Sequence, residues 1–200
     1  MRRSHSMKSV KSAQAGSTLI EVLVAALILS IGIMALVGVQ GTSSQMAKMA
    51  QQRGDASRLA QDYADRVRAN IDPNNRQQFI QQVLPIYATP VAYNGNVAAQ
   101  NIPQGCIGTT TCAPQDVARL DLAEMREQAR LLLPNGAFYV TQAAAGAGAT
   151  APIVLDVWII WQTASTKSDD NGTLTGLACP AGAVSANTKN AQCLLTRVML

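Results

Sequence analysis

The feature that most constrains this chain is an apolar run over residues 19–39, close to its start. The run contains one charged residue, Glu21, and no proline. A helix rises about 1.5 Å per residue, so the run spans roughly 30 Å, the thickness of the hydrocarbon core of a bilayer. Residues 1–16 contain four basic residues and no acidic one, a bias that keeps a flanking segment cytoplasmic. The sequence therefore predicts one membrane-spanning helix with the rest of the chain on the far side.

Glu21 is the unusual residue of this run. A carboxylate inside an apolar helix costs about 3 kcal/mol to insert, so it needs a partner and commonly marks function. The alternative is that Glu21 lies at the headgroup level and is only tolerated there. An ordinary secretory signal has an apolar core of about 7–15 residues followed by a small-x-small cleavage site. The run here is longer and contains Glu21, which disfavours a removed signal, whereas a plain signal anchor stays open.

The charge balance argues against nucleic-acid binding. The chain has 16 basic and 12 acidic residues, and four of the basic ones lie before residue 17. The remainder therefore has 12 of each sign and a formal net charge of zero. Binding to nucleic acid needs a basic face, and no basic run is visible beyond residue 16.

The residue types also disfavour catalysis. The single histidine, His5, lies in the basic leader, so the remaining chain has no histidine for a nucleophilic triad or a metal site. The glycines at 146 and 148 lack the lysine and the helix that a phosphate-binding loop requires. Asp169 and Asp170 form the most obvious carboxylate pair, but they lie in the stretch Ser-Asp-Asp-Asn-Gly, which indicates a turn. We expect no enzymatic activity and no cofactor.

Helical periodicity continues beyond the apolar run and predicts one helix over residues 17–70, roughly 80 Å long at about 1.5 Å per residue. Asp72-Pro73 ends it, because proline disfavours helix in the residue before it. Gly38 and Gly41 either allow close helix approach or let the helix unwind where it leaves lipid. The predicted apolar stripe of the second half consists of Met46, Met49, Ala56, Leu59, Tyr63 and Val67.

The remaining chain alternates helical and strand patterns. We expect a short helix over residues 76–84 stopped by Pro85, an irregular region over 85–105, and an amphipathic helix over 115–133 ended by Pro134-Asn135-Gly136. Strands are predicted over residues 137–141, 153–161 and 193–200, with a flexible connection over 143–151. In the second strand the face of Ile153, Val157 and Trp161 is apolar and should cover the long helix. The expected fold class is α+β, with a long amino-terminal helix packed on a small antiparallel sheet. The predicted apolar stripe of the 115–133 helix is Val117, Leu120, Met125 (or Leu122), Ala129 and Leu132.

Four cysteines lie on the far side of the membrane, and an even number in an oxidising compartment indicates two disulfides. Cys106–Cys112 and Cys179–Cys193 are the local pairings, although four cysteines allow three connectivities. Closing the second loop contributes about 3 kcal/mol in the chain-entropy model. Zinc is disfavoured because the spacings are long and no histidine is available. Asn171-Gly172-Thr173 fits a glycosylation sequon, but Asn-Gly is first a turn.

The segment from Gly16 through Ser17, Thr18, Leu19, Ile20 and Glu21, behind a basic leader, resembles the class III signal of type IV prepilins and pseudopilins. The resemblance implies cleavage after Gly16 by a prepilin peptidase, followed by methylation of the new amino terminus at Ser17. It also implies that Glu21 neutralises the terminal ammonium of a neighbouring subunit in a bundle of low dielectric constant. The family usually has Phe or Met where this sequence has Ser17.

Within this family the apolar segment is similar to minor pilins of the PilV type. Two cysteines, a helix containing DLAEMREQARLLLPNG, a strand ending near Trp161 and a closing cysteine before LLTRVML extend the similarity. The loop between Cys179 and Cys193 resembles the disulfide-closed variable loop near the carboxyl terminus of pilins. The implied domains are a cleaved leader (1–16), a transmembrane half (17–40) and an amphipathic half (41–72) of the long helix, and a periplasmic head (73–200).

The resemblance implies a minor type IV pilin that helps to initiate pilus assembly in the tip complex, with effects on twitching motility and adhesion. Its implied partners are other minor pilins, the major pilin, a tip adhesin, the prepilin peptidase and the inner-membrane assembly machinery. The implied location is the inner membrane with a cytoplasmic amino terminus, and later the pilus fibre or its tip. Two alternatives stay open: a minor pseudopilin of type II secretion, and a signal-anchored periplasmic binding domain.

Overall fold

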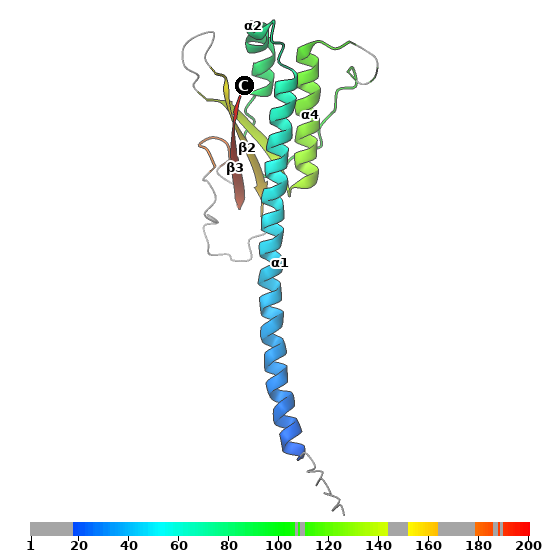
Figure 1. Ribbon diagram of the computed structural model, residues 1–200, viewed down its shortest axis with the longest axis vertical. Coiled ribbons are helices and arrows are strands. Elements are labelled where there is room, and N and C mark those ends of the chain that lie inside the picture. The colour runs from blue at the N-terminus through cyan, green and yellow to red at the C-terminus, as the bar shows by residue number, and fades with distance from the viewer. Residues whose placement is uncertain are drawn as a thin grey trace, which may run out of the picture. The chain divides into compact units, whose positions relative to one another are not determined.

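The computed structural model describes residues 18–106, 108, 111–143, 152–163, 179–185, 188 and 190–200. The chain divides into two compact units, Met1–Met46 and Ala47–Leu200. Its helices and strands (Figure 1) are α1 (Leu19–Ala69), α2 (Arg76–Gln78), the π-helical turn η1 (Phe79–Val83), α3 (Leu84–Tyr87), α4 (Pro114–Leu132), β1 (Ala137–Gln142), β2 (Val154–Gln162) and β3 (Ala191–Met199). The leader, the connection over 144–151, Asp169-Asp170 and Asn171-Gly172-Thr173 lie outside the described residues.

The long helix is present, as predicted, with 51 residues. Within the described part of the chain, α1 is the one helix that is long and apolar enough to cross a membrane. Its most apolar window has a mean hydropathy of 2.8, and none of that window is buried. The amino-terminal part of α1 thus displays its apolar side chains on every side, as a helix does when its surroundings are not water.

The second unit begins within α1, and here the helix has a buried stripe. The predicted positions Ala56, Leu59, Tyr63 and Val67 are buried, together with Ala60 and Ala64. The prediction is wrong for Met46, which is 67% exposed, and only in part right for the half-buried Met49. Half of this buried stripe therefore consists of alanine, at positions 56, 60 and 64.

The helical segment after α1 is longer than predicted, because Pro85 does not stop it. The turn η1 is followed by α3, which has Pro85 within its first turn. Proline is tolerated there, since a first-turn N–H has no partner inside the helix anyway. The extension matters for packing, because it buries Leu84 and Tyr87, each 1% exposed.

The sheet has the order β1-β2-β3, and both pairings are antiparallel. Ile159 in the central strand is opposite Phe138 of β1 and Leu194 of β3. One face of β2 is buried along its length in the same cluster as the stripe of α1, which confirms the α+β fold class and the predicted contact face. The β2 residues of this face are Leu155, Val157, Ile159 and Trp161, continued by Ile153 just before the strand.

The outer face of the sheet is covered at one end only. Ile160 is fully buried there in a second, smaller cluster with Tyr93, Ala183 and Cys193. An isolated parallel bridge between Tyr93 and Val184 holds the two covering segments together. Burial on both faces explains why β2 loses its strict alternation after Ile159.

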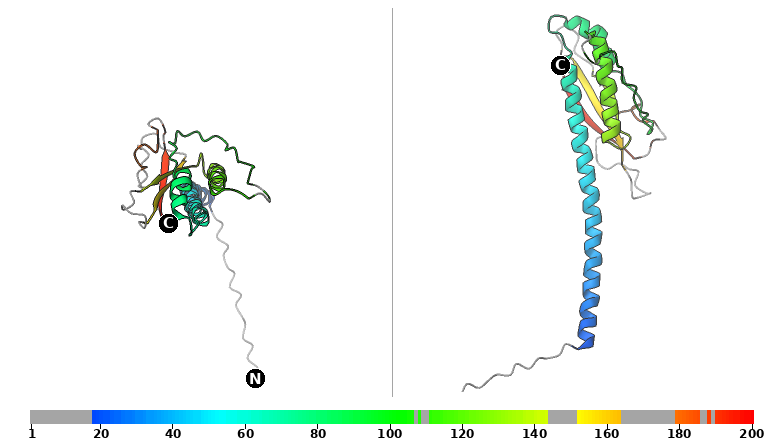
Figure 2. Two further views of the ribbon diagram at one scale, coloured as in Figure 1. Left: turned by 90° about the horizontal axis from the view of Figure 1, so that it is seen from above. Right: turned by 90° about the vertical axis from the view of Figure 1, so that its right-hand side faces the viewer.

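Helix α4 lies beside the second half of α1, and the sheet lies beside the same stretch (Figures 1 and 2). The apolar stripe predicted for α4 is correct for Met125, for its alternative Leu122 and for Ala129. It is wrong for Leu132, which is 55% exposed. The buried residues are Ala118, Leu122, Met125 and Ala129, with Leu133 just beyond the helix. Val117 and Leu120 are only half-buried, because the face that contacts α1 is rotated from the predicted one. Helix α4 ends before Pro134-Asn135-Gly136, as predicted, and Asn135 adopts the positive φ of 51° that asparagine tolerates in such turns.

Candidate assembly segment and the interior of the head

The candidate assembly segment begins at the start of α1. Gly16 and Ser17 lie outside the described residues, and Thr18 is the last residue before the helix. The Thr18 carbonyl accepts hydrogen bonds from the backbone N–H groups of Glu21 and Val22, at 3.0 and 3.3 Å. These bonds close the first turn and place Glu21 within it.

The position of Glu21 gives its carboxylate two electrostatic uses. Thr18 and Glu21 have the Thr-x-x-Glu spacing of a capping box, and the amino-terminal turn of a helix favours a negative charge. The Glu21 residue is also exposed, so the carboxylate is open to a cation from another chain. The first use is available to any helix, whereas the second requires a neighbouring chain that supplies the cation.

The apolar surface that follows Glu21 is large and uncovered. Leu19 is 83% exposed, and Leu29 and Val39 are each 66% exposed. A contiguous surface of this kind indicates contact with lipid or with other apolar helices. Gly32, Gly38 and Gly41 lie in the same stretch, and an added Cβ at any of them would meet no other atom within 4 Å. No contact among the described residues therefore requires glycine at these three positions.

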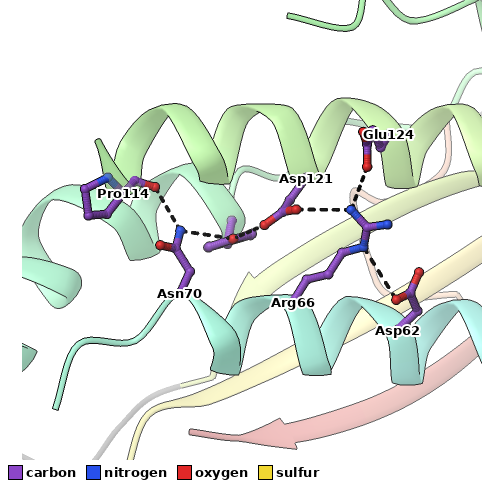
Figure 3. A network of polar contacts seen from close by, with 7 residues as sticks. Asp62, Arg66, Asn70, Pro114, Asp121 and Glu124 are labelled. Carbon is purple, nitrogen blue, oxygen red and sulfur yellow. Dashed lines mark hydrogen bonds and ion pairs between the residues drawn. The ribbon is translucent and has the colours of Figure 1, made fainter. Parts of the chain in front are cut away.

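The head has a polar network between α1 and α4, and the sequence alone did not reveal it (Figure 3). The guanidinium of Arg66 donates from Nη1 to Asp121 at 3.1 Å and to Glu124 at 2.7 Å. Its Nε lies 3.5 Å from Asp62, one helical turn away on α1. Arg66 thus has one partner on its own helix and two on α4, which makes it a contact between the two helices.

The network continues toward the carboxyl-terminal end of α1. The Tyr87 hydroxyl donates to Asp121 at 2.6 Å, and the Asn70 amide donates to the Tyr87 oxygen at 3.2 Å. The same amide donates to the Pro114 carbonyl at 2.8 Å (Figure 3). Through these bonds Asn70 connects the end of α1 to α3 and to the first residue of α4.

The charges of this network are stabilised in their ordinary states. Partial burial by itself lowers the pKa of Arg66, but its hydrogen bonds with Glu124 and Asp121 outweigh that effect and raise the pKa overall. Burial raises the pKa of Tyr87, and its hydrogen bond to the Asp121 carboxylate raises it further. Arg66 therefore stays charged and Tyr87 stays neutral near pH 7. In these states the ion pairs and hydrogen bonds of the network stay formed near pH 7.

The four cysteines form two disulfides, Cys106–Cys112 and Cys179–Cys193, with Cα–Cα separations of 5.7 and 5.3 Å. These are the two local pairings that the sequence favoured. Cys193 lies on β3 opposite Ile160, so the second bridge attaches the start of the 179–184 segment to the outer face of the sheet. Among the described residues there is no group of three or more His, Cys, Asp or Glu side chains suited to a metal ion.

Comparison with known proteins gives one match. Residues 11–37 match the family model described as the Prokaryotic N-terminal methylation motif. No curated protein and no solved structure matches the chain. The match includes Gly16, Ser17 and Glu21 and ends within the apolar part of α1, so it covers the segment that the resemblance singled out.

The motif, the long apolar helix and the small antiparallel sheet together support a type IV pilin-like protein, in the class that includes the pseudopilins. The motif implies processing by a prepilin peptidase, and the apolar helix that follows implies a membrane-anchored chain.

Proposed function

We propose that the chain is a low-abundance subunit of a type IV pilus, a minor pilin that helps to initiate assembly and forms part of the tip complex. The observation that carries the proposal is the processing motif placed directly before Glu21 and an uncovered apolar helix. Removal of the leader would leave an amino terminus at Ser17, four residues ahead of a carboxylate and in front of a surface suited to a helix bundle. The head would then present a surface specific to its neighbours, with the periplasm as its location before assembly.

A minor pseudopilin of type II secretion would use the same segment in the same way. The two disulfides of the head favour the pilus, because minor pseudopilins tend to have smaller heads and fewer cysteines. A signal-anchored periplasmic binding domain would also account for α1, but in it the Glu21 carboxylate would meet no cation of a neighbouring chain and would keep only its local role at the helix start.

The first experiment is the intact mass and the amino-terminal sequence of the protein extracted from membranes. We expect a chain that begins at Ser17. One additional methyl group would show that the new amino terminus is methylated as well as cleaved. A chain that still begins at Met1 would remove the basis for any pilin-like role. In a deletion strain, loss of surface pili with normal exoprotein secretion would identify the pilus, and the reverse result would identify the secretion system.

Glu21→Gln tests the assembly role of the carboxylate, since it removes the charge and keeps the size of the side chain. We expect the variant to be processed and membrane-bound but to fail to restore filaments in the deletion strain. Ser30→Ala is a matched control within α1, because the Ser30 hydroxyl only donates to the Leu27 carbonyl of its own helix, at 2.7 Å. Full restoration by Glu21→Gln would show that the carboxylate is merely tolerated.

A further inference from the structure

The junction between α1 and the sheet contains two buried polar atoms that have no hydrogen-bond partner within the described chain. They are Nε1 of Trp161, on β2, and Oε1 of Gln52, on α1. Trp161 is only 3% exposed, so bulk water does not satisfy its indole N–H. A buried donor or acceptor without a partner is costly, and native proteins rarely leave such an atom without one.

Both residues line one small cavity. Its volume is about 10 Å³, and its walls are formed by Met49, Gln52, Arg53, Trp161, Thr163 and Gln192. A space of about this size holds one water molecule and excludes a side chain or an organic ligand. Four of its six lining residues have polar side chains, so a water molecule at this place has protein groups with which to form hydrogen bonds.

The chemistry of the two atoms selects the occupant. The indole N–H can only donate, and the amide oxygen can only accept. An anion would accept from Trp161 but would be repelled by the Gln52 oxygen. A cation would be repelled by the indole N–H and by the guanidinium of Arg53 in the same wall. A single neutral molecule that accepts one hydrogen bond and donates another meets both demands, and at this size that molecule is water.

We propose that the cavity is a binding site for one structural water, which accepts from Trp161 Nε1 and donates to Gln52 Oε1. The water joins α1 to β2 at the turn where the helix first packs against the sheet, before the buried stripe that begins at Ala56. Along α1 this site lies ahead of the Arg66 network. The inference concerns the head alone and does not depend on the filament role.

The test is nuclear magnetic resonance of the full processed chain in detergent micelles, observing the indole protons of the two tryptophans. Trp158 is half-buried on the outer face of the sheet and is the internal control, and Trp158→Phe assigns the two signals. In a rotating-frame NOE spectrum we expect a cross-peak between the Trp161 indole proton and water. Its sign should be opposite to that of a chemical-exchange peak, which shows that the contact is dipolar. A visible Trp161 indole proton without such a cross-peak would overturn the proposal.

A second measurement uses the coupling of two substitutions. Gln52→Met and Trp161→Phe each remove one partner of the water, so each should lower the melting temperature of the full chain. If one water connects the two residues, the double variant should lose less than the sum of the single losses. Strictly additive losses would count against a shared water. If Trp161→Phe does not fold, the cross-peak measurement on the unmodified chain decides alone.

Discussion

Among single residues, Arg66 shows that the contribution of a charged side chain to stability depends on where it lies. Its side chain is 25% exposed, and that of Asp121, with which it forms a hydrogen bond, is 15% exposed. One cation here faces three carboxylates, those of Asp62, Asp121 and Glu124. Without the guanidinium, the carboxylates of Asp121 and Glu124 would repel one another in a site that is partly withdrawn from water.

We therefore expect Arg66→Met to lower the free energy of unfolding by about 1–3 kcal/mol, allowing for the residual exposure of the pair. Chemical denaturation of the processed chain measures the change. Arg68→Met is the matched control, because Arg68 pairs with Asp65 at 3.2 Å with side chains 51% and 76% exposed. That surface pair should contribute less than about 0.5 kcal/mol. Equal losses in the two variants would mean that the network adds nothing beyond a surface ion pair.

At the scale of elements, the end of α4 depends on one glycine. The N–H of Gly136 donates to the Leu133 carbonyl at 3.0 Å and closes the turn that leads into β1. An added Cβ at Gly136 would lie in contact with the carbonyl oxygen of Ala129, 2.7 Å from the carbonyl carbon of Ala129 and 2.8 Å from the Cβ of Leu133. The obstruction is backbone, so no side chain can rotate to relieve it.

Gly136→Ala is expected to lower the free energy of unfolding by about 1–3 kcal/mol, the range for overpacking a tight site. Gly54→Ala is the control and should act in the opposite direction. An added Cβ at Gly54 meets nothing within 4 Å, and alanine is favoured over glycine inside a helix by roughly 1 kcal/mol. Thermal melting of both variants provides the comparison. A Gly136→Ala protein as stable as the parent would show that the turn shifts freely.

At the scale of the whole molecule, three buried tyrosines link stability to alkaline pH. Burial raises the pKa of Tyr63 and of Tyr87, and it raises the pKa of Tyr93 to about 12. In the unfolded chain these phenols ionise near pH 10, about the value of an exposed tyrosine. The folded state then holds protons that the unfolded state has released, so the stability present below about pH 10 is lost as the pH rises toward 12 and beyond.

We expect the melting temperature to fall steadily above about pH 10. In the folded protein the phenolate absorbance of the buried tyrosines should rise only at a higher pH than that of an exposed tyrosine. Tyr93→Phe should flatten the slope between about 10 and 12 with little loss near pH 7, because the Tyr93 hydroxyl has no hydrogen-bond partner within the described chain. Tyr63→Phe should lower stability already at neutral pH, since the Tyr63 hydroxyl donates to the Tyr87 carbonyl at 2.8 Å. An unchanged alkaline slope in Tyr93→Phe would contradict the burial of that phenol.

The sequence was most informative where one local property sufficed. An apolar run of helical length predicts α1 without knowledge of any neighbour, and the strand patterns, with two-sided alternation argued for the central strand, predict the three strands with errors of one or two residues. The candidate assembly segment was predicted on the same basis, because Gly16, Ser17 and Glu21 form a contiguous motif that the family match includes. The helices of the head were harder to predict, as Pro85 shows. A proline ends a helix when it falls in the interior, but it is tolerated in the first turn, and Pro85 lies in the first turn of α3.

The tertiary structure decided which charged and polar residues lie between elements. Residue spacing along α1 does not indicate that Arg66 has partners on another helix, and its hydrogen bonds to Asp121 and Glu124 exist only because α4 lies against α1. Gln52 and Trp161 are far apart in the chain, and they line the same cavity because α1 packs against the sheet. Periodicity describes one element at a time, and which face an element turns toward another depends on the volume and polarity of both. The sequence by itself determined the anchor, the processing motif and the fold class, and the packing of α1, α4 and the sheet determined the interior of the head.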